Sequence, residues 1–526
     1  MDLDVVDKLV IGLQTAFTLH NLMYCFFGVF LGTFVGVLPG IGSLVTIALL
    51  LPITFHLEPT PAIVMLAGVY YGSAYGGSTA SILLNLPGTP SSAVTCIDGH
   101  EMCKQGRAGV ALLASAVSSF IGGGIGILIM MMFSETIAEF ALEFGPAEYF
   151  ALMLLGLIAA STIASGSPLK GIAMVLTGIL VGIVGTDVNS GAYRFTFGSN
   201  ELTDGITLIG PALGMFGVTE VIASIRRLKS GAITRNVSMR SMIPSRDDMR
   251  RFWGPTLRGS GIGAFFGALP GTGGVLASFM SYAVEKRVAK DPARFGSGAI
   301  EGVAGPEAAN NAADQTAFIP TLTLGVPGSV VMALIIGALL IHGIVPGPRL
   351  VLDKPDLFWG LIMSFWIGNV LLLLLNIPLI GLWVKVLAIP YHILYPAILM
   401  FVCIGAYSIN NNHFDVILVV VFAIFGYVMR LLGFSPAPLL LGLVLGPLME
   451  EHMRRALVLS QGDFMTFVNR PVAGSFMAFT FLILIYMIWT TIKEARGTTK
   501  RATSRTDSPT GRSAADVDEH VGPRHG

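Results

Sequence analysis

The sequence predicts an all-α polytopic membrane protein. Hydrophobic residues make up 53% of the 526 residues and charged residues only 12%, whereas a soluble domain carries about 25% charged residues. The mean hydropathy is +0.74. Glycine (63) and proline (28) are abundant, as expected for closely packed and broken transmembrane helices. A soluble protein is therefore excluded, and the balanced charge, 32 basic and 32 acidic residues, gives no indication of a nucleic-acid partner.

Neither end of the chain contains a predicted membrane crossing. The first residues, MDLDVVDKLV, lack the basic segment and cleavage site of a secretory signal, so no processing is expected. Residues 494–526 are polar and charged, and we expect a disordered cytoplasmic tail. The four cysteines have no recognised spacing and are interpreted as packing residues, without a metal site.

Apolar stretches of roughly 20 residues, enough to cross a hydrocarbon core of about 30 Å, follow one another along the chain. We expect about 11 to 12 transmembrane helices in total. Two apolar stretches, 21–55 and 259–284, are interrupted by LPGIG (38–42) and LPGTGG (269–274), and these turn sequences predict re-entrant hairpins. The crossing candidates are 61–95, 109–133, 149–164, 171–186, 205–224, 309–345, 357–386, 391–409, 414–431, 436–449 and 470–492.

Basic residues indicate the orientation of the loops, because they concentrate on the cytoplasmic side. Arg250, Arg251 and Arg258 precede the stretch 259–284, and Lys286 and Arg287 follow it. Both ends of this hairpin are therefore predicted to be cytoplasmic. The connection 134–148 is acidic and is expected outside, and the hairpin 21–55 has few flanking basic residues and is expected to open outward.

The two halves of the chain resemble each other. Residues 32–42 match residues 263–273 at seven of eleven positions, and the Pro-Gly pair of 85–88 recurs in 325–328. The prediction is therefore two repeats, each with a hairpin, a broken helix and further crossings, and an odd number of crossings inverts the second repeat, as in many secondary transporters. The predicted divisions are repeat 1 (1–228, hairpin 21–55, broken helix 61–95), a cytoplasmic connection (229–258), repeat 2 (259–459, hairpin 259–284, broken helix 309–345) and a final transmembrane helix (460–493).

Hairpin tips and helix breaks leave backbone groups without helical partners in a medium without water, so protein, ligand or ion must satisfy them. Free N–H groups at helix N-termini suit a carboxylate, and free carbonyls suit Na⁺. Single nearby Ser and Thr residues are more simply explained as packing residues. The candidate substrate or cation ligands are Gly40, Gly42, Ser43, Asn85, Pro87, Gly88, Gly271, Thr272, Gly273, Pro327 and Gly328.

Ionisable residues are otherwise scarce in the apolar segments, which argues against a relay of several buried carboxylates. The exception is the segment 298–316, which contains Asn310, Asn311 and Asp314. Asp314 precedes Pro327 by 13 residues, about 20 Å along an unbroken helix, which predicts a position at the cytoplasmic mouth. These three residues are candidates for a gate or cation pathway, and a helix cap or an ion-pair anchor remains the alternative.

Several motifs together resemble the large membrane subunit of the tripartite tricarboxylate transporter family, the TctA type. They are LPGIG at 38–42, YGGSTASILLNLPG at 75–88 with Asp98-Gly99, LPGTGG at 269–274, AIEGVAGPEAANNAADQ at 299–315, and GVPGS with HGIVPGP at 325–348. The resemblance implies a small four-helix membrane subunit, a periplasmic binding protein for a di- or tricarboxylate, coupling to Na⁺ or H⁺, and a place in the bacterial inner membrane.

Three other functions are alternatives to such a gradient-driven permease. No G-x-x-x-x-G-K-[ST] loop is present, so an ATP-driven permease would need another subunit for its nucleotide. No H-E-x-x-H or G-x-S-x-G pattern lies within a crossing, so an enzyme is not expected and no catalytic residue is named. A channel-like protein for another small solute stays open, because paired hairpins also occur in channels.

Overall fold

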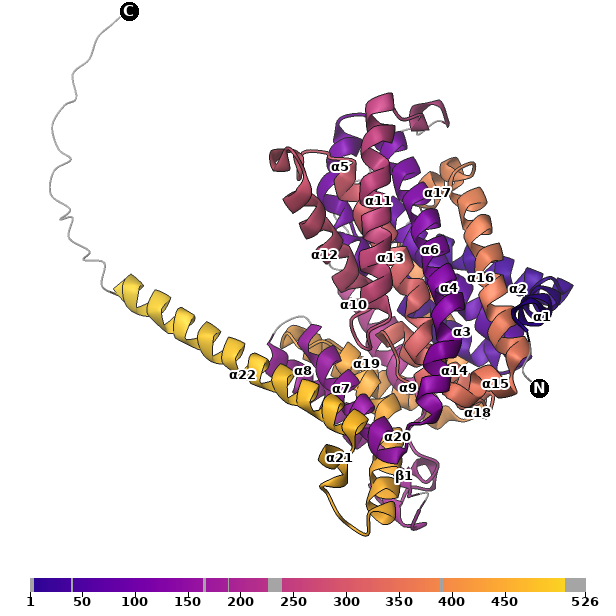
Figure 1. Cartoon of the computed structure of the whole chain (residues 1–526), viewed down its shortest axis with the longest axis vertical. Coiled ribbons are helices and arrows are strands. Elements are labelled where there is room, and N and C mark those ends of the chain that lie inside the picture. Colours follow the sequence, from indigo (N-terminus) through magenta and orange to yellow (C-terminus); the bar gives the residue numbers. More distant parts are fainter. Residues whose placement is uncertain are drawn as a thin grey trace, which may run out of the picture.

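The computed structural model describes residues 4–38, 41–163, 167–187, 189–225, 239–387, 389 and 391–506. These residues are almost entirely helical, and the described part contains one small sheet, in which β1 (Gly185–Thr186) pairs antiparallel with β2 (Tyr193–Arg194). Figure 1 shows long helices packed side by side, with α22 running beside α7 and away from the rest. The prediction of an all-α protein is confirmed.

The helices differ widely in length, and several are joined by short 3-10 or π turns. In chain order they are α1 (Val5–Ala16), α2 (Leu19–Val37), α3 (Gly42–Thr54), α4 (Pro59–Leu84), α5 (Thr95–Lys104), α6 (Ala108–Leu142), α7 (Pro146–Ile163), α8 (Pro168–Gly182), α9 (Ile209–Ala212), α10 (Thr219–Ile225), α11 (Arg246–Gly267), α12 (Gly273–Val288), α13 (Glu301–Thr316), α14 (Val330–Ile341), α15 (Pro348–Asp353), α16 (Pro355–Asn376), α17 (Ile380–Val386), α18 (Tyr391–Asn410), α19 (His413–Leu431), α20 (Ala437–Leu459), α21 (Thr466–Asn469) and α22 (Pro471–Thr506). The 3-10 turns are η1 (Pro90–Ala93), η2 (Asn200–Leu202), η4 (Met239–Met242) and η5 (Pro292–Arg294), and the π turns are η3 (Leu213–Val218) and η6 (Pro320–Leu324).

Length and composition identify the helices that can cross a membrane. Among the described residues, 5 helices are long and apolar enough: Leu19–Val37, Ala108–Leu142, Pro355–Asn376, His413–Leu431 and Pro471–Thr491. Shorter apolar helices lie at Gly42–Thr54, Pro146–Thr162, Pro168–Gly182, Ile209–Ala223, Val330–Ile341 and Leu394–Ser408. The protein is therefore a multi-pass membrane protein, while the total of 11 to 12 crossings stays a prediction.

Both interrupted stretches form a pair of helices with a break at the predicted turn. Helix α2 ends at Val37 and α3 begins at Gly42, and α11 ends at Gly267 and α12 begins at Gly273. The two ends of the second pair lie together, because Arg258 donates to Glu285 at 2.5 Å. This contact agrees with a hairpin whose ends share one side; that this side is the cytoplasm stays a prediction.

Glycines allow the first helix of each pair to contact the following broken helix backbone to backbone. A methyl group placed on Gly32 would lie 2.5 Å from the carbonyl oxygen of Val69, and one on Gly263 would lie 2.1 Å from that of Ala309. The neighbouring turns repeat the contact: Gly28 and Gly36 against α4, and Gly259 and Gly267 against α13. The sequence similarity of the two halves is therefore also a similarity of packing.

The later helices of each half pack on the other half. Helix α8 packs along α20, and α19 packs along α9 and η3. Two ion pairs also connect the two halves: Arg430 donates to Glu220 at 2.5 Å, and Arg194 donates to Glu450 at 2.8 Å. The two glutamates follow similar short segments of the two halves, GPALG at 210–214 before Glu220 and GLVLG at 442–446 before Glu450. The inversion of the second repeat relative to the membrane stays a prediction.

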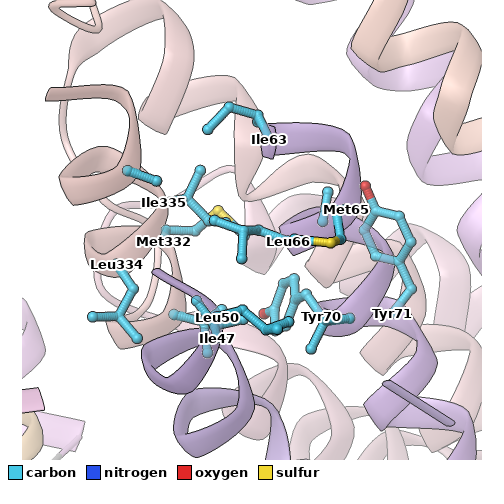
Figure 2. Close-up of a cluster of buried hydrophobic side chains, with 14 of the residues drawn as sticks. Ile47, Leu50, Ile63, Met65, Leu66, Tyr70, Tyr71, Met332, Leu334 and Ile335 are labelled. Carbon is cyan, nitrogen blue, oxygen red and sulfur yellow. The ribbon is translucent and has the colours of Figure 1, made fainter. Parts of the chain in front are cut away.

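The apolar core joins the two halves as well. Figure 2 shows Ile47 and Leu50 of α3, Ile63 and Leu66 of α4, and Ile335 of α14 in one buried cluster. Because α14 follows the break of the second half, burial of this apolar surface holds the second break against the first half. The core thereby fixes the relative position of the segments that carry the predicted site residues.

Three boundaries differ from the sequence predictions. Helix α11 begins at Arg246, inside the predicted connection 229–258, because Ser245 and Asp248 form a capping box there. Helix α13 begins at Glu301, before the predicted start at 309. Helix α22 continues to Thr506, beyond the expected start of the disordered tail at 494, through residues such as Lys, Glu, Ala and Arg that favour helix. Residues 226–238 of the connection and 507–526 of the tail lie outside the described residues.

Candidate functional site

In each half, the hairpin tip lies beside the Pro-Gly break of the broken helix. A methyl group on Gly42 would lie 3.6 Å from the carbonyl oxygen of Gly88, and one on Gly273 would lie 3.9 Å from that of Gly328. Both tip glycines have positive φ angles, 63° and 60°, a conformation that other residues rarely adopt. The structure thus brings together, within each half, the tip and the break that the sequence singled out.

The two breaks also begin in the same way. Helix α4 ends with Asn85 in the left-handed conformation at φ 58°, and η6 ends with Gly325 at φ 68°. The prolines of the following Pro-Gly pairs differ in burial, because Pro87 is exposed whereas Pro327 is buried; Gly88 and Gly328 are both buried. Asn85 is exposed as well, so the first break opens to the surroundings and the second lies inside the protein.

A polar cluster lies at the second tip, where α12 begins. The hydroxyl of Tyr70, on α4, donates to Oδ1 of Asp314 at 2.6 Å. A methyl group on Gly274 would lie 2.4 Å from Oδ1 of Asn310 and 3.0 Å from Oδ1 of Asp314. Tyr70 also interacts with Ser329, the residue that follows the second break and caps α14. Residues from α4, α12, α13 and the second break therefore meet at one point.

Asp314 lies beside the second break, so the separation predicted from an unbroken helix is wrong. The prediction assumed a straight helix from Asp314 to Pro327, but α13 ends at Thr316 and the chain then turns through η6. As a result, a methyl group on Gly328 would lie 3.1 Å from Cβ of Ala317. The turn brings the break back to the end of α13, and Asp314 is only 4% exposed.

Among the described residues, Asp314 has a hydrogen bond from Tyr70 but no ion pair, and the side chain of Asn310 has no hydrogen bond. None of the ion pairs between described residues includes Asp314. Asn310 is 1% exposed, and both polar atoms of its side chain lack a hydrogen bond among the described residues. Because buried polar groups are almost always bonded, these atoms are available to a ligand, an ion or water. The ion-pair anchor considered from the sequence is not present for Asp314 in the described structure.

The first half lacks a counterpart of this cluster. Aligning the left-handed residues Asn85 and Gly325 places Ala74 opposite Asp314, each eleven residues before its cap. Ser43, at the first tip, is half-buried. Gly88 contacts Gly36, whose carbonyl oxygen would lie 2.3 Å from a methyl group on Gly88. The acidic group of the site therefore comes from the second half alone.

The remaining predicted residues have structural contacts. The hydroxyl of Thr272 donates to the carbonyl oxygen of Leu269 at 3.0 Å and closes the turn of the tip. Gly271 has φ 80° and packs on Ala160 of α7. Asn311 donates to Oγ of Ser119 on α6 at 2.8 Å, so it is directed away from the tip. Gly40 lies outside the described residues.

Asp98 holds the chain in front of α13, a role that sequence reasoning missed. Its Oδ1 atom accepts N–H bonds from Gly296, Gly298 and Ala299 at 2.8 to 2.9 Å, and its Oδ2 atom accepts from Tyr282 at 2.9 Å. Three backbone amides and one phenol hydroxyl therefore converge on this one carboxyl group. The Asp98-Gly99 motif gave the only sequence signal, and it did not reveal the partner loop.

Comparison with known proteins identifies the family of the chain. The model of the tripartite tricarboxylate transporter TctA family matches residues 22–441. The chain belongs to the TctA family. The match begins in α2 and extends into α20, so it includes both hairpins, both breaks and the cluster around Asp314.

Two relatives of this TctA protein come from Agrobacterium vitis. An uncharacterized 52.8 kDa protein in the TAR-I ttuC' 3' region is 51% identical over 494 residues, covering 94% of this chain and 98% of the relative. An uncharacterized protein in the TAR-II ttuC' 3' region is 58% identical over 234 residues, covering 44% of this chain and 97% of the relative. No solved structure matches. The family is one of transporters, and the site is therefore best considered as part of a permease.

Proposed function

We propose that the chain is the permease subunit of a tripartite secondary transporter, driven by an ion gradient, that imports di- or tricarboxylates across the bacterial inner membrane. A periplasmic binding protein delivers the substrate, and a small four-helix membrane subunit completes the complex. The chain itself carries out no catalytic chemistry. Membership of the TctA family supports this proposal, and the observation that carries the mechanism is the buried Asp314 beside the second tip and break.

The substrate carboxylate is placed at the helix N-termini of the second half. Helix α12 begins at Gly273 and α14 begins after Ser329, and a methyl group on Gly273 would lie 3.5 Å from Cβ of Ser329. The first N–H groups of a helix have no partner within the helix, and the helix dipole adds about half a positive charge. Two such ends attract an anion, as in other transporters with broken helices.

Asp314 makes this transport dependent on a cation. At about 4 Å and an effective dielectric constant near 20, two negative charges repel by about 4 kcal/mol. The substrate therefore binds well only when Na⁺ or H⁺ neutralises Asp314, and the unpartnered oxygen of Asn310 is available to such an ion. Binding of anion and cation is thereby coupled, because each stabilises the site for the other.

The test is transport by the purified three-component complex in proteoliposomes, with radiolabelled citrate as the probe. We expect accumulation above the outside concentration when an inward Na⁺ or H⁺ gradient is applied. Asp314→Asn should lose this accumulation, whereas Asp353→Asn, which changes an exposed carboxylate at the end of α15, should behave as the wild type.

Three results would contradict the proposal. Uptake that only equilibrates citrate, with or without a gradient, indicates a channel. Saturable uptake of citrate without any binding protein contradicts the tripartite mechanism. Full accumulation by Asp314→Asn shows that the coupling cation binds elsewhere.

A further inference from the structure

A second buried carboxyl group lies on α13, apart from the tip and the breaks. Glu307 is 1% exposed and is surrounded by hydroxyl groups from three other helices. Ser78 of α4 donates to Oε2 at 2.7 Å, Ser119 of α6 donates to the same atom at 3.3 Å, and Thr95 of α5 donates to Oε1. The sequence placed Glu307 in an acidic segment, but hydroxyl residues so distant in the chain could not be assigned to it.

No cation balances this carboxyl group within the described structure, since no ion pair between described residues includes Glu307. The titratable groups that face it are Tyr75 of α4, Cys96 of α5 and, on its own helix, Asp314. Two acidic groups of other helices lie against α13 at Gly302 and Gly305, and both have partners of their own. Glu285 of α12 is paired with Arg258 of α11, and Asp98 of α5 is bonded to the loop before α13.

Burying a lone charged carboxylate costs several kcal/mol, and three neutral hydroxyl groups offset only part of that cost. A neutralising species is therefore required for at least part of the time. The hydroxyl oxygens already touch the carboxyl oxygens, so a metal ion could not enter between them without moving α4, α5 and α6 apart. A proton needs no such space, because hydroxyl groups can accept a hydrogen bond as readily as they donate one.

We propose that Glu307 is a proton-binding site separate from the Asp314 site. In a permease of the proposed kind, Glu307 takes up a proton on one side of the membrane and releases it on the other, which links import to the proton gradient. This link to transport rests on the proposed function, whereas the binding of a proton does not. Glu307 and Asp314 are two turns apart on one face of α13, about 10 Å along its axis, with Asn310 between them.

Infrared spectroscopy of the purified protein tests proton binding without transport. The wild type should show a carbonyl band of a protonated carboxylic acid that disappears as the pH is raised, and Glu307→Gln should lack that band. The spectrum of Asp314→Asn shows which part of the carbonyl band comes from Asp314. Ser78→Ala should move the titration of the band to higher pH, because it removes a donor to the charged form. Ser81→Ala, on the same helix and bonded to Ser92 instead, is the matched control and should leave the titration unchanged.

The link to transport is tested in proteoliposomes with citrate. Glu307→Gln should reduce the stimulation of uptake by an inward proton gradient at least tenfold, while citrate exchange without a gradient persists. If the wild type moves no carboxylate but the band depends on Glu307, the proposed function fails and the proton site stands. If Glu307→Gln has the spectrum of the wild type, the proton site is refuted; if it keeps the response to a proton gradient, the link to import is refuted.

Discussion

Substitution of Gly263 by alanine tests whether close packing of α11 on α13 positions the site. A methyl group at this position would lie 2.1 Å from the carbonyl oxygen of Ala309. Real contacts of this kind stay above about 3.0 Å, so the two backbones must separate by about 0.9 Å (3.0 − 2.1). The obstacle is backbone and not a flexible side chain, and no rotamer change can relieve it.

Overpacking of this kind typically costs about 1 to 3 kcal/mol. Helix α11 also leads into the tip at Gly273, so its displacement moves the tip away from Asp314. We therefore expect Gly263→Ala to lower the apparent melting temperature of the detergent-solubilised protein by several degrees. Citrate uptake by the reconstituted complex should fall at least tenfold.

Gly261 provides a matched control on the same helix. A methyl group there would meet no atom within 4 Å, and alanine favours helix over glycine by about 1 kcal/mol. Gly261→Ala should therefore leave the protein as stable as the wild type or slightly more stable, with normal uptake. If Gly263→Ala and Gly261→Ala have equal melting temperatures and equal uptake, the packing argument is wrong.

Three further predictions concern the predicted motifs and their partners. Asp98→Asn should weaken the three amide bonds in front of α13 and lower the thermal stability by about 1 to 3 kcal/mol, measured by melting in detergent; an unchanged melting temperature would show that the loop is held otherwise. Asn85→Ala should reduce the substrate or cation dependence of uptake without loss of folded protein, and uptake kinetics identical to the wild type would remove Asn85 from the site. Cysteines introduced at Arg258 and Lys286 should both react with a membrane-impermeant reagent added from the cytoplasmic side, and labelling from opposite sides would contradict the re-entrant hairpin.

The sequence predicted the helical class and the positions of the helix breaks because both depend on local chemistry. Apolar stretches must satisfy their backbone groups internally and so form helices in a membrane. The LPG motifs interrupt those helices, because proline removes an N–H donor and glycine permits positive φ angles. These effects act within a few residues of the chain, and the observed breaks between α2 and α3 and between α11 and α12 follow them.

Sequence reasoning misplaced Asp314 because the distance to Pro327 depends on the path of the chain between them. A π turn at Pro320–Leu324 shortens that path, and its formation depends on packing that the motif alone does not reveal. Likewise, the sequence singled out the segment 298–316 for its ionisable residues, but it did not reveal that Glu307 and Asp314 are both buried on α13. The residues that donate hydrogen bonds to them, Ser78 and Tyr70, lie more than 200 positions earlier in the chain.

The sequence by itself determined that this chain is a helical membrane protein with two recurring hairpin and break motifs, since hydropathy and backbone chemistry are local properties. The tertiary structure alone decided which polar groups share a site. The residues next to a hydroxyl or carboxyl group in the sequence do not indicate which distant residue it will bond. Only the packing of α4, α5 and α6 on α13 brings Tyr70 to Asp314 and the three hydroxyl groups to Glu307.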